Sequence, residues 1–505
     1  MIPIKRALLS VSSKDHLIEL ARILAEYKVE IIATNRTYQY LQENHIPCIL
    51  LSDYTGYPEM IHGRVKTLNP KIFAGILARN QYGEMEEIAA HGIQKFDLVC
   101  VNLYPFHEAI QQSSEEEKWL DEIDIGGVSL IRASAKNYHE CVTLSDPLDY
   151  QEFLSEFQQN KGSITTSFSL ECMKRSFLRT SQYDAQIAKQ FYNREEEKLA
   201  VYYMQKHTTL RYGENPHQSA ALWMSCPPAT QFPMGLRQFH GKEMSYNNYL
   251  DVSMGLKLLD EFTRPACVIV KHNNPCGCSE SDSLDEAYQQ AHACDPVSAY
   301  GGIFLFNRPP TSSISQHIHE HFAEVVVAPD FEENALAILQ QKKNVRILQR
   351  EEMIQPLEEI KAVHQSYLIQ TPDAALLSEI KVITGETLTP EDIEEIQFGL
   401  KVVKHVKSNA IVVTNHHTTY GVGSGQPNRI NSTRFSLNQA GEKAKGAYLS
   451  SDAFFPFPDS VLEASRYGIR MIIEPGGSIR DAEIIAEAKK HGIILIFTGL
   501  RHFLH

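Results

Sequence analysis

The first 147 residues alternate between short apolar segments and segments with helical periodicity. Strand-length apolar runs occur at residues 7–12, 30–34 and 96–106 ("ALLSVS", "EIIAT" and "FDLVCVNLYPF"). Between the first two runs, apolar side chains fall at helical spacing, at Leu17, Leu20, Ala21 and Leu24. Because strands that alternate with helices usually form a parallel sheet covered by those helices, we predict an α/β domain over residues 1–147.

The remaining sequence predicts a connector and a second α/β domain, since 505 residues exceed what one core normally serves. Residues 148–197 are charged and helical in pattern, and we interpret them as a helical connector. Strand and helix patterns return over residues 198–505. Two segments there, 265–277 and 404–426, each couple Lys, His and Asn to an apolar strand, which favours two related subdomains.

Charge and hydropathy exclude several classes of function. A net charge of −14 disfavours general binding of nucleic acid, although an anionic small substrate is compatible with local clusters of Lys and Arg. No apolar run reaches the roughly 18 residues of a membrane helix, and the first residues lack the apolar core of a signal peptide. We therefore expect a cytoplasmic protein with no membrane partner.

The spacing of cysteine and histidine argues against a catalytic metal. The sequence "NPCGC" is similar to the Pro-Cys-x-x-Cys of zinc nucleobase deaminases, but Cys276 and Cys278 are one residue too close and no His-x-Glu precedes them. The pair His416-His417 also lacks partners at ligand spacing, and we expect it on a strand or turn. We predict no metal site.

A lysine and a histidine stand side by side where an apolar strand meets turn-forming residues, in "VIVKHNNPCG" (268–277). Neighbouring side chains of a strand point to opposite faces, so Lys271 and His272 can serve one site only if the strand ends there. The Asn, Pro and Gly residues that follow are typical of a turn. A solvated strand end with two incidental polar side chains is the alternative interpretation.

Polar residues of the first domain gather where the predicted strands end, which predicts one functional rim. They are Ser10, Ser12, Lys14, Thr34, Asn102 and Tyr104. The segment "GRVKTLNP" adds Arg64, Lys66 and Thr67. Two cations beside a hydroxyl suit a phosphate, and a basic surface loop is the alternative.

Two other segments have the composition of binding sites. In "EIDIGG", Asp124 precedes the pair Gly126-Gly127, which opens a predicted helix that carries Lys136 at its far end. In "SDAFFPFPD" (451–459), three phenylalanines and two prolines make a rigid apolar wall. Such a wall suits either core packing or a flat aromatic ligand.

With these segments in view, the whole chain resembles the bifunctional purine-biosynthesis family called AICAR transformylase/IMP cyclohydrolase. The resemblance rests on uncommon motifs in fixed order. They are "LLSVSSKD", "GRVKTL", "NLYPF", "DIGG", "AKN", "RYGENPHQ", "SYNN", "KHNNPCG", "DPVSAYGG", "HVKSNA", "SDAFFPFPD", "PGGSIRD" and "GLRHFLH".

The resemblance implies two successive reactions and an architecture for each. The carboxyl-terminal domain, built from two cytidine-deaminase-like subdomains without zinc, would move a formyl group from 10-formyltetrahydrofolate to the amine of 5-aminoimidazole-4-carboxamide ribotide. The amino-terminal domain, similar to methylglyoxal synthase, would then close the ring to inosine monophosphate (IMP) with loss of water. The chain would form a homodimer with transformylase sites at the subunit interface.

The resemblance also implies the residues for formyl transfer. Lys271 and His272 match the catalytic pair, and Asn409 matches the residue that orients the formyl oxygen and contacts the folate. The implied ribotide-binding residues are Arg211, Tyr212, Asp295, Gly302, Arg429 and Arg501. The other implied folate-binding residues are Phe454, Phe455 and Asp459.

For ring closure, the resemblance implies four catalytic residues. Lys66 would hold phosphate or another anion, while Tyr104, Asp124 and Lys136 would relay protons and stabilise the tetrahedral oxygen. The implied substrate-binding residues are Ser12, Lys14, Thr34, Thr37, Arg64, Thr67, Asn102, Gly126 and Gly127.

The chain departs from the family pattern in its first domain. Thr34-Asn35-Arg36-Thr37 stands where the family has Ser-Gly-Gly-Thr, so the freedom of two glycines is lost and Arg36 adds a charge. Asn69 and Phe73 stand where many relatives carry histidines. Separately, a first domain that only binds a nucleotide, as similar domains do in some larger enzymes, is an alternative. A second domain that is a zinc-free nucleic-acid-binding relative of deaminases is another, which the acidic balance disfavours.

Overall fold

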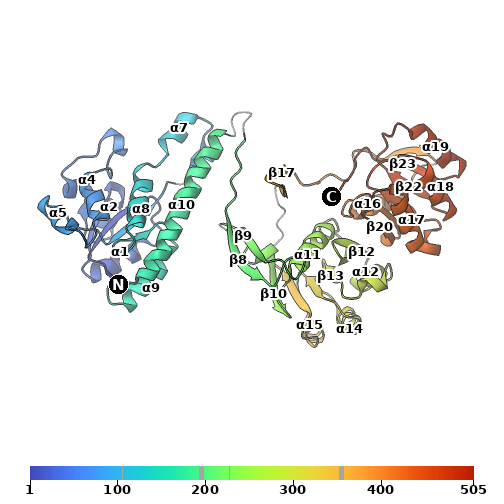
Figure 1. Cartoon of the computed structure of the whole chain (residues 1–505), viewed down its shortest axis with the longest axis horizontal. Helices are drawn as coiled ribbons and strands as arrows, with labels where there is room; N and C mark the ends of the chain where they lie inside the picture. Colours follow the sequence, from blue (N-terminus) through green and yellow to red (C-terminus); the bar gives the residue numbers. More distant parts are fainter. Residues whose placement is uncertain (105, 193–197, 227, 352–357, 386) are drawn as a thin grey trace. The chain divides into compact units, whose positions relative to one another are not determined.

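The computed structural model describes residues 1–104, 106–192, 198–226, 228–351, 358–385 and 387–505. It divides into two compact units, Met1–Tyr203 and Met204–His505, called the first and second unit below (Figure 1). This division falls shortly after the predicted end of the connector, whose residues 193–197 lie outside the described residues. None of the described helices has the length and apolar character of a membrane span.

A parallel sheet forms the centre of the first unit. Its strands are β2 (Arg6–Val11), β3 (Glu30–Ala33), β4 (Ile49–Leu50), β5 (Leu98–Asn102) and β6 (Val142–Leu144), and they lie in the order β4-β3-β2-β5-β6. All neighbours are parallel, which confirms the predicted α/β fold. In β2, Leu8 packs with Ile72 in one core, whereas its neighbour Leu9 packs with Leu17 and Phe153 in another, as alternation along a strand requires.

Helices pack on this sheet and bury its apolar residues. They are α1 (Leu17–Glu26), α2 (Asn35–Glu43), α3 (Leu51–Thr55), α4 (Pro70–Leu77), α5 (Glu84–Ala90), α6 (Phe106–Gln112), α7 (Glu116–Asp121), α8 (Gly126–Lys136), α9 (Asp149–Gln159) and α10 (Thr166–Tyr192). The short strands β1 (Ile2–Pro3) and β7 (Ser163–Ile164) pair antiparallel. The residues predicted as a connector form α9 and α10. Because α9 contacts α1 and α10 contacts α8 and β6, both helices belong to the packing of the first unit.

One mixed sheet of twelve strands runs through the second unit. In chain order its strands are β10 (Leu236–His240), β11 (Ala266–Lys271), β12 (Asn274–Glu280), β13 (Ile303–Phe306), β14 (Val325–Ala328), β15 (Arg346–Arg350), β18 (Lys381–Thr384), β19 (Ile411–Asn415), β20 (Thr418–Gly423), β21 (Tyr448–Ser451), β22 (Met471–Glu474) and β23 (Ile494–Phe497). Their order across the sheet is β10-β15-β14-β13-β11-β12-β20-β19-β21-β22-β23-β18. Outside it, β8 (Met204–Leu210) pairs with β9 (Ala220–Ser225), and β16 (Glu359–Val363) pairs with β17 (Ser366–Gln370).

The two halves of this sheet repeat one topology. The helices are α11 (Tyr246–Leu259), α12 (Leu284–His292), α13 (Pro296–Ala299), α14 (Ser312–His321), α15 (Glu333–Gln340), α16 (Pro390–Val403), α17 (Arg429–Ala440), α18 (Asp459–Arg466) and α19 (Asp481–Lys490). In the first repeat (236–350), β10, α11, the hairpin β11–β12 and α12 precede three further strands. In the second (381–497), β18, α16, the hairpin β19–β20 and α17 do the same. The repeats join where β12 pairs with β20, in agreement with two related subdomains.

Glycines at matching positions let a helix of each repeat approach its hairpin. An added Cβ on Gly277 in β12 would lie 2.0 Å from the carbonyl oxygen of Ala291 in α12. One on Gly421 in β20 would lie 1.9 Å from the carbonyl oxygen of Ser436 in α17. Neither space admits a methyl group, so each hairpin is fixed against its helix by direct contact between backbones.

We expect Gly277→Ala and Gly421→Ala to destabilise the second unit, because a backbone carbonyl cannot move aside as a flexible side chain can. Each should lower the free energy of unfolding by about 3 kcal/mol. Gly425→Ala is the control, since its Cβ meets nothing within 4 Å and only its φ of +66° opposes the change; it should lose about 1 kcal/mol. Denaturant unfolding followed by circular dichroism measures all three. Equal losses would contradict the packing explanation.

Candidate active sites

The Lys271-His272 pair lies at a tight hairpin turn of the first repeat. β11 ends at Lys271 and β12 begins at Asn274, and these two residues pair across the turn. His272 and Asn273 are the turn residues, with φ values of 50° and 61°. A two-residue type I′ turn requires positive φ at both positions. The strand therefore ends at Lys271, as the sequence predicts.

The side chain of Lys271 is held by backbone carbonyls. Its ammonium group donates hydrogen bonds to the carbonyl oxygens of Tyr300 and Gly301, at 2.9 Å each. Because an ammonium group has three N–H donors, one is left for a ligand. Gly302 follows directly, and an added Cβ there would lie 3.2 Å from the carbonyl oxygen of Val270, so this loop lies against the end of β11. His272 is exposed.

A carboxylate that the sequence did not single out lies against this turn. Asp251 in α11 accepts a hydrogen bond from the backbone N–H of Asn273 at 2.7 Å. Burial raises the pKa of Asp251, and the Asn273 N–H and the nearby side chains of His272 and Lys271 oppose that rise. The contact joins residues 22 positions apart, so no local pattern around Asp251 predicts it.

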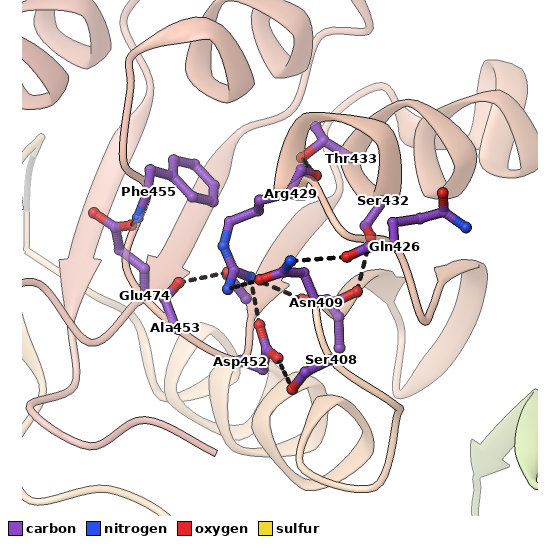
Figure 2. A network of polar contacts seen from close by, with 12 residues as sticks. Ser408, Asn409, Gln426, Arg429, Ser432, Thr433, Asp452, Ala453, Phe455 and Glu474 are labelled. Carbon is purple, nitrogen blue, oxygen red and sulfur yellow. Dashed lines mark hydrogen bonds and ion pairs between the residues drawn. The ribbon is translucent and has the colours of Figure 1, made fainter. Parts of the chain in front are cut away.

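The turn meets the segment that carries Asn409. The backbone N–H of Lys407 donates to Asn274 Oδ1 at 3.3 Å, so the hairpin of the first repeat contacts the residues that lead into β19. Asn409 Nδ2 donates to the carbonyl oxygen of Gln426 at 2.8 Å, and Asn409 Oδ1 accepts from Arg429 at 2.8 Å (Figure 2). The structure thus brings together the two segments that carry the residues predicted to act in formyl transfer.

Arg429 is buried, and its guanidinium group is engaged inside the protein. Only 5% of the residue is exposed. It forms an ion pair with Asp452, which has no exposed surface, and it donates to Ser451 Oγ at 2.8 Å as well as to Asn409 (Figure 2). These bonds use the two Nη atoms of the guanidinium group, and ribotide binding by Arg429, which the resemblance implies, stays a prediction. In this structure the guanidinium group of Arg429 also holds the oxygen of the Asn409 amide.

Only part of the phenylalanine wall faces outward. Phe454 and Phe457 are 39% and 48% exposed, whereas Phe455 has no exposed surface and packs in the core of the second repeat. This burial corrects the prediction that Phe455 contacts folate, because its ring has no free face. Asp459, also predicted to bind folate, is exposed at the start of α18.

A buried glutamate is hydrogen-bonded to the backbone of this phenylalanine segment. Glu474, at the end of β22, has no exposed surface, and its Oε2 accepts a hydrogen bond from the backbone N–H of Phe455 at 2.6 Å (Figure 2). Its Oε1 has no hydrogen-bond partner among the described residues. Burial raises the pKa of Glu474 to about 8, and the Phe455 N–H and the positive charge of Arg429 act against that rise.

The other predicted ribotide-binding residues differ in whether their side chains are exposed or bonded within the protein. Arg211 and Arg501 are exposed, and their guanidinium groups lie over the rings of Tyr212 and Phe503, at 5.4 and 4.8 Å from the ring centroids. Asp295 instead caps α13 by accepting from the backbone N–H of the third residue of that helix. Two surface cations are therefore presented to solvent, while Asp295 shapes its own loop.

The second hairpin turn repeats the first without its lysine. His416 and His417 are the turn residues between β19 and β20, with φ values of 51° each, as a turn position predicts. Asn415 ends β19 where Lys271 ends β11. In the part of the chain that the structure describes, no group of three or more His, Cys, Asp or Glu side chains is placed to hold a metal ion.

In the first unit, the carboxyl ends of β2 and β5 and the start of α2 meet at one rim. Asn102 Oδ1 accepts from the backbone N–H and the hydroxyl of Ser12 at 2.5 and 2.8 Å. Thr37 Oγ1 accepts from the backbone N–H of Val11 and from Lys14 Nζ at 3.2 Å each. Ser12 and Asn102 are thus bonded to each other, as are Lys14 and Thr37. All four residues are predicted to bind substrate in this unit.

Three cations gather at this rim. Burial lowers the pKa of Lys14, and the positive charges of Arg36 and Lys66 lower it further. Because α2 begins directly after Thr34, Asn35 and Arg36 are helical and need no glycine. The first N–H groups of a helix have no partner within it. Together with the three cations they make a site suited to a phosphate.

Close packing requires the paired glycines at the start of α8. An added Cβ on Gly126 would lie 2.3 Å from Thr67 Oγ1, and one on Gly127 would lie 2.3 Å from Asp124 Oδ2. The backbone N–H of Gly127 donates to Asp124 Oδ1 at 2.6 Å. Burial raises the pKa of Asp124, and the Gly127 N–H and the positive charge of Lys66 oppose the rise. These five predicted residues therefore form one cluster.

Three other predicted residues of this unit are exposed or half-buried. Arg64 is exposed and forms a surface ion pair with Asp121. Lys136 is exposed at the last turn of α8, about 15 Å from the first residue of that helix at its usual rise. Tyr104 follows β5 and is half-buried. Within one copy of this unit, the helix length keeps Lys136 from Asp124.

The two positions where many relatives carry histidines have structural roles here. Asn69 caps α4 by accepting a hydrogen bond from the backbone N–H of Lys71 at 2.9 Å. Phe73 packs against the core beneath the sheet. The local fold therefore uses the Asn69 amide as a helix cap and the Phe73 ring for core packing. Neither role needs an imidazole.

The raised pKa of Glu474 predicts a pH-dependent stability. Between its ordinary value, about 4.3, and about 8, the folded protein holds this proton and the unfolded chain does not, so stability falls as pH rises. Glu474→Gln should therefore gain stability relative to the native chain from pH 5 to pH 8. Glu483→Gln, at a surface carboxylate, is the control and should show no such trend. Urea unfolding at several pH values measures the difference, and parallel curves for both variants would contradict the assignment.

Comparison with known proteins agrees with this arrangement. The family model "AICARFT/IMPCHase bienzyme" matches residues 134–439, and the "MGS-like domain" model matches residues 16–129. The bifunctional purine biosynthesis protein PurH of Clostridium botulinum (strain Kyoto / Type A2) is 42% identical over 504 residues, and that of Bacillus subtilis (strain 168) is 42% identical over 512. PurH of Thermoanaerobacter sp. (strain X514) is 44% identical over 509 residues. Each alignment covers 99% of this chain and 100% of the relative.

The MGS-like match confirms the fold expected for the first domain. The bienzyme model spans more than half of the chain, and the PurH proteins match it from end to end. The chain therefore belongs to the AICARFT/IMPCHase bienzyme family and is a bifunctional enzyme of purine biosynthesis, which catalyses the last two steps of IMP synthesis.

Proposed function

We propose that the two steps are divided between the two units, with formyl transfer in the second and ring closure in the first. The observation that carries this proposal is the contact between the Lys271-His272 turn and the segment of Asn409, through Asn274 and Lys407. It supports one acyl-transfer site built from both repeats. The cluster of Lys66 and Asp124 supports a separate site in the first unit.

In formyl transfer, His272 and Lys271 have complementary roles. The amine of the ribotide is a poor nucleophile because its lone pair is delocalised into the imidazole and carboxamide. A base must take its proton as the new N–C bond forms, and an imidazole side chain suits that role near neutral pH. Lys271, held by two carbonyls with one N–H free, stabilises the negative charge on the formyl oxygen or protonates the leaving nitrogen.

Asn409 orients the formyl oxygen, and its own orientation is set by the protein. One of its amide N–H groups donates to Gln426, and its oxygen accepts from Arg429, which leaves its second N–H for the substrate. The cosubstrate 10-formyltetrahydrofolate supplies the formyl group. The outward rings of Phe454 and Phe457 fit its flat ring system, with Asp459 beside them.

Phosphate recognition is assigned to different cations in the two units. In the second unit, Arg211 and Arg501 suit the ribotide phosphate because they are exposed and aromatic rings support them. In the first unit, Lys14, Arg36 and Lys66 suit it at the start of α2. Local clusters of this kind allow an acidic protein to bind an anion.

Ring closure is an intramolecular attack of the carboxamide nitrogen on the formyl carbon. Holding the two groups in a near-attack geometry therefore provides much of the acceleration. Asp124, a buried carboxylate beside Lys66, is suited to moving a proton, with Tyr104 from the end of β5 as a second group. Lys136 is part of this proposal only through the resemblance.

We assign the protein to the cytoplasm and propose that two copies assemble. The hairpin β16–β17 supports a dimer because it exposes apolar side chains that a second copy would cover. They are Ile360, Tyr367, Leu368 and Ile369. The hairpin β8–β9 likewise exposes Met204 and Trp223.

Single substitutions should separate the two activities. Lys271→Ala should lower the rate of formyl transfer about 100-fold or more and leave ring closure intact. Lys66→Ala should do the reverse, because it removes a charge from the first unit alone. Each full-length variant is assayed with ribotide and formyl-folate for the first step and with the formylated ribotide for the second. Loss of both steps in a folded variant would contradict the division, and a native chain that forms no IMP would favour a nucleotide-sensing first unit.

Arg36 should contribute to substrate binding in the first unit. Arg36→Ala should raise the KM for the formylated ribotide about tenfold, since a charge-assisted hydrogen bond contributes about 1.5–3 kcal/mol, and should leave kcat nearly unchanged. Arg22→Ala, at an exposed position in α1, is the matched control. Initial rates of ring closure measure both, and an unchanged KM in Arg36→Ala would remove this residue from the phosphate site.

A further inference from the structure

In both repeats of the second unit, a carboxylate from a helix holds the hairpin turn. In the first, Asp251 of α11 accepts from the backbone N–H of Asn273 at 2.7 Å. In the second, Glu395 of α16 accepts from the backbone N–H of His417 at 2.8 Å. Each N–H belongs to the second turn residue, and α11 and α16 occupy equivalent places in the repeats.

The position of each carboxylate along its helix is also the same. Asp251 stands four residues before Gly255, and Glu395 stands four residues before Gly399. Both glycines lie where the helix touches the sheet: an added Cβ would meet Leu305 at 2.5 Å in the first repeat and Ser450 at 2.3 Å in the second. The helix is therefore fixed against the sheet one turn away from the carboxylate, which makes the carboxylate a rigid support for the turn.

The turn needs such support because its backbone is strained. His272 and Asn273 both have positive φ without being glycine, and a backbone N–H bonded to a carboxylate favours that conformation. At the end of the preceding strand, Lys271 donates to the carbonyl oxygens of Tyr300 and Gly301. The turn is thus held at two points, by Asp251 at Asn273 and by the bonds of Lys271 at the end of the strand before it.

The two turns differ in the residues that they carry. The first presents Lys271 and His272, and the second presents Asn415 and His416 at the same places. Asp251 bonds to Asn273, which directly follows Lys271 and His272 in the same turn, so the carboxylate lies next to this pair of residues. Both repeats therefore share the carboxylate that supports the turn. Only in the first repeat does that carboxylate lie beside the pair Lys271 and His272.

We propose that Asp251 is a positioning residue for formyl transfer. Its hydrogen bond to Asn273 fixes the turn, and through the turn it fixes the placement of the His272 imidazole relative to the Lys271 ammonium. Asp251 acts on the backbone and touches neither substrate. This inference rests on the proposed roles of Lys271 and His272.

Variants of the full chain test the proposal. Asp251→Ala removes the acceptor and should lower the kcat of formyl transfer about 10- to 100-fold, since small misplacements of reacting groups have effects of that size. The KM for the ribotide should change less than kcat. Asp251→Asn keeps an oxygen acceptor for the Asn273 N–H and should retain at least about one third of the native kcat. Ring closure in the first unit, measured on the same samples, should be unchanged in both variants.

The second repeat provides the matched control. Glu395→Ala removes the equivalent hydrogen bond from a turn without the lysine, and it should lower the melting temperature about as much as Asp251→Ala does while leaving kcat within about twofold of native. Native kcat in Asp251→Ala, equal losses of kcat in Asp251→Asn and Asp251→Ala, or an equal loss in Glu395→Ala would each overturn the proposal.

His272→Ala, assayed in parallel, tests the premise. If that variant keeps its formyl-transfer rate, the proposed function of the turn fails. If it loses the rate while Asp251→Ala does not, only the inference about Asp251 fails.

Discussion

The second unit depends on a backbone conformation that most side chains avoid. In an extended strand Lys271 and His272 would face opposite sides of the sheet, and no packing of that strand could bring both to one substrate. The type I′ turn ends the alternation after Lys271 and reverses the chain within two residues. Left-handed backbone at a residue other than glycine costs about 1–2 kcal/mol. The hairpin bonds and the helix that packs on Gly277 must offset that cost.

The buried ion pair of Arg429 and Asp452 serves orientation more than stability. Removing two charges from water costs about as much as their attraction returns, so a buried pair is weak support for a fold. Breaking one is expensive, about 3–5 kcal/mol. A pair that is hard to break keeps the guanidinium fixed, and Arg429 fixes the Asn409 amide in turn.

Sequence predicted those features that depend on local patterns. The parallel sheet follows from alternating apolar periods, and the end of β11 follows from the turn residues after Lys271. Local patterns could not predict contacts between distant segments. Asp251 is an example, because its partner is 22 residues away. The burial of Phe455 was also beyond such patterns: of two adjacent phenylalanines one must face the core, and only the packed structure decides which. Similarly, Asn35-Arg36 suggested a lost glycine turn, whereas the segment is the first turn of a helix.

The two repeats separate what the scaffold requires from what the chemistry requires. Capping boxes begin α11 at Ser245 and α16 at Thr389, and a carboxylate supports each hairpin turn. These features recur at equivalent places of the two repeats, so they belong to the shared scaffold. The lysine at the end of β11 does not recur, since an asparagine ends β19. A fold alone does not determine function. Lys271 therefore differs between two turns that share one backbone and one carboxylate support, so structure alone does not require it. That difference supports Lys271 as a group on which formyl transfer depends.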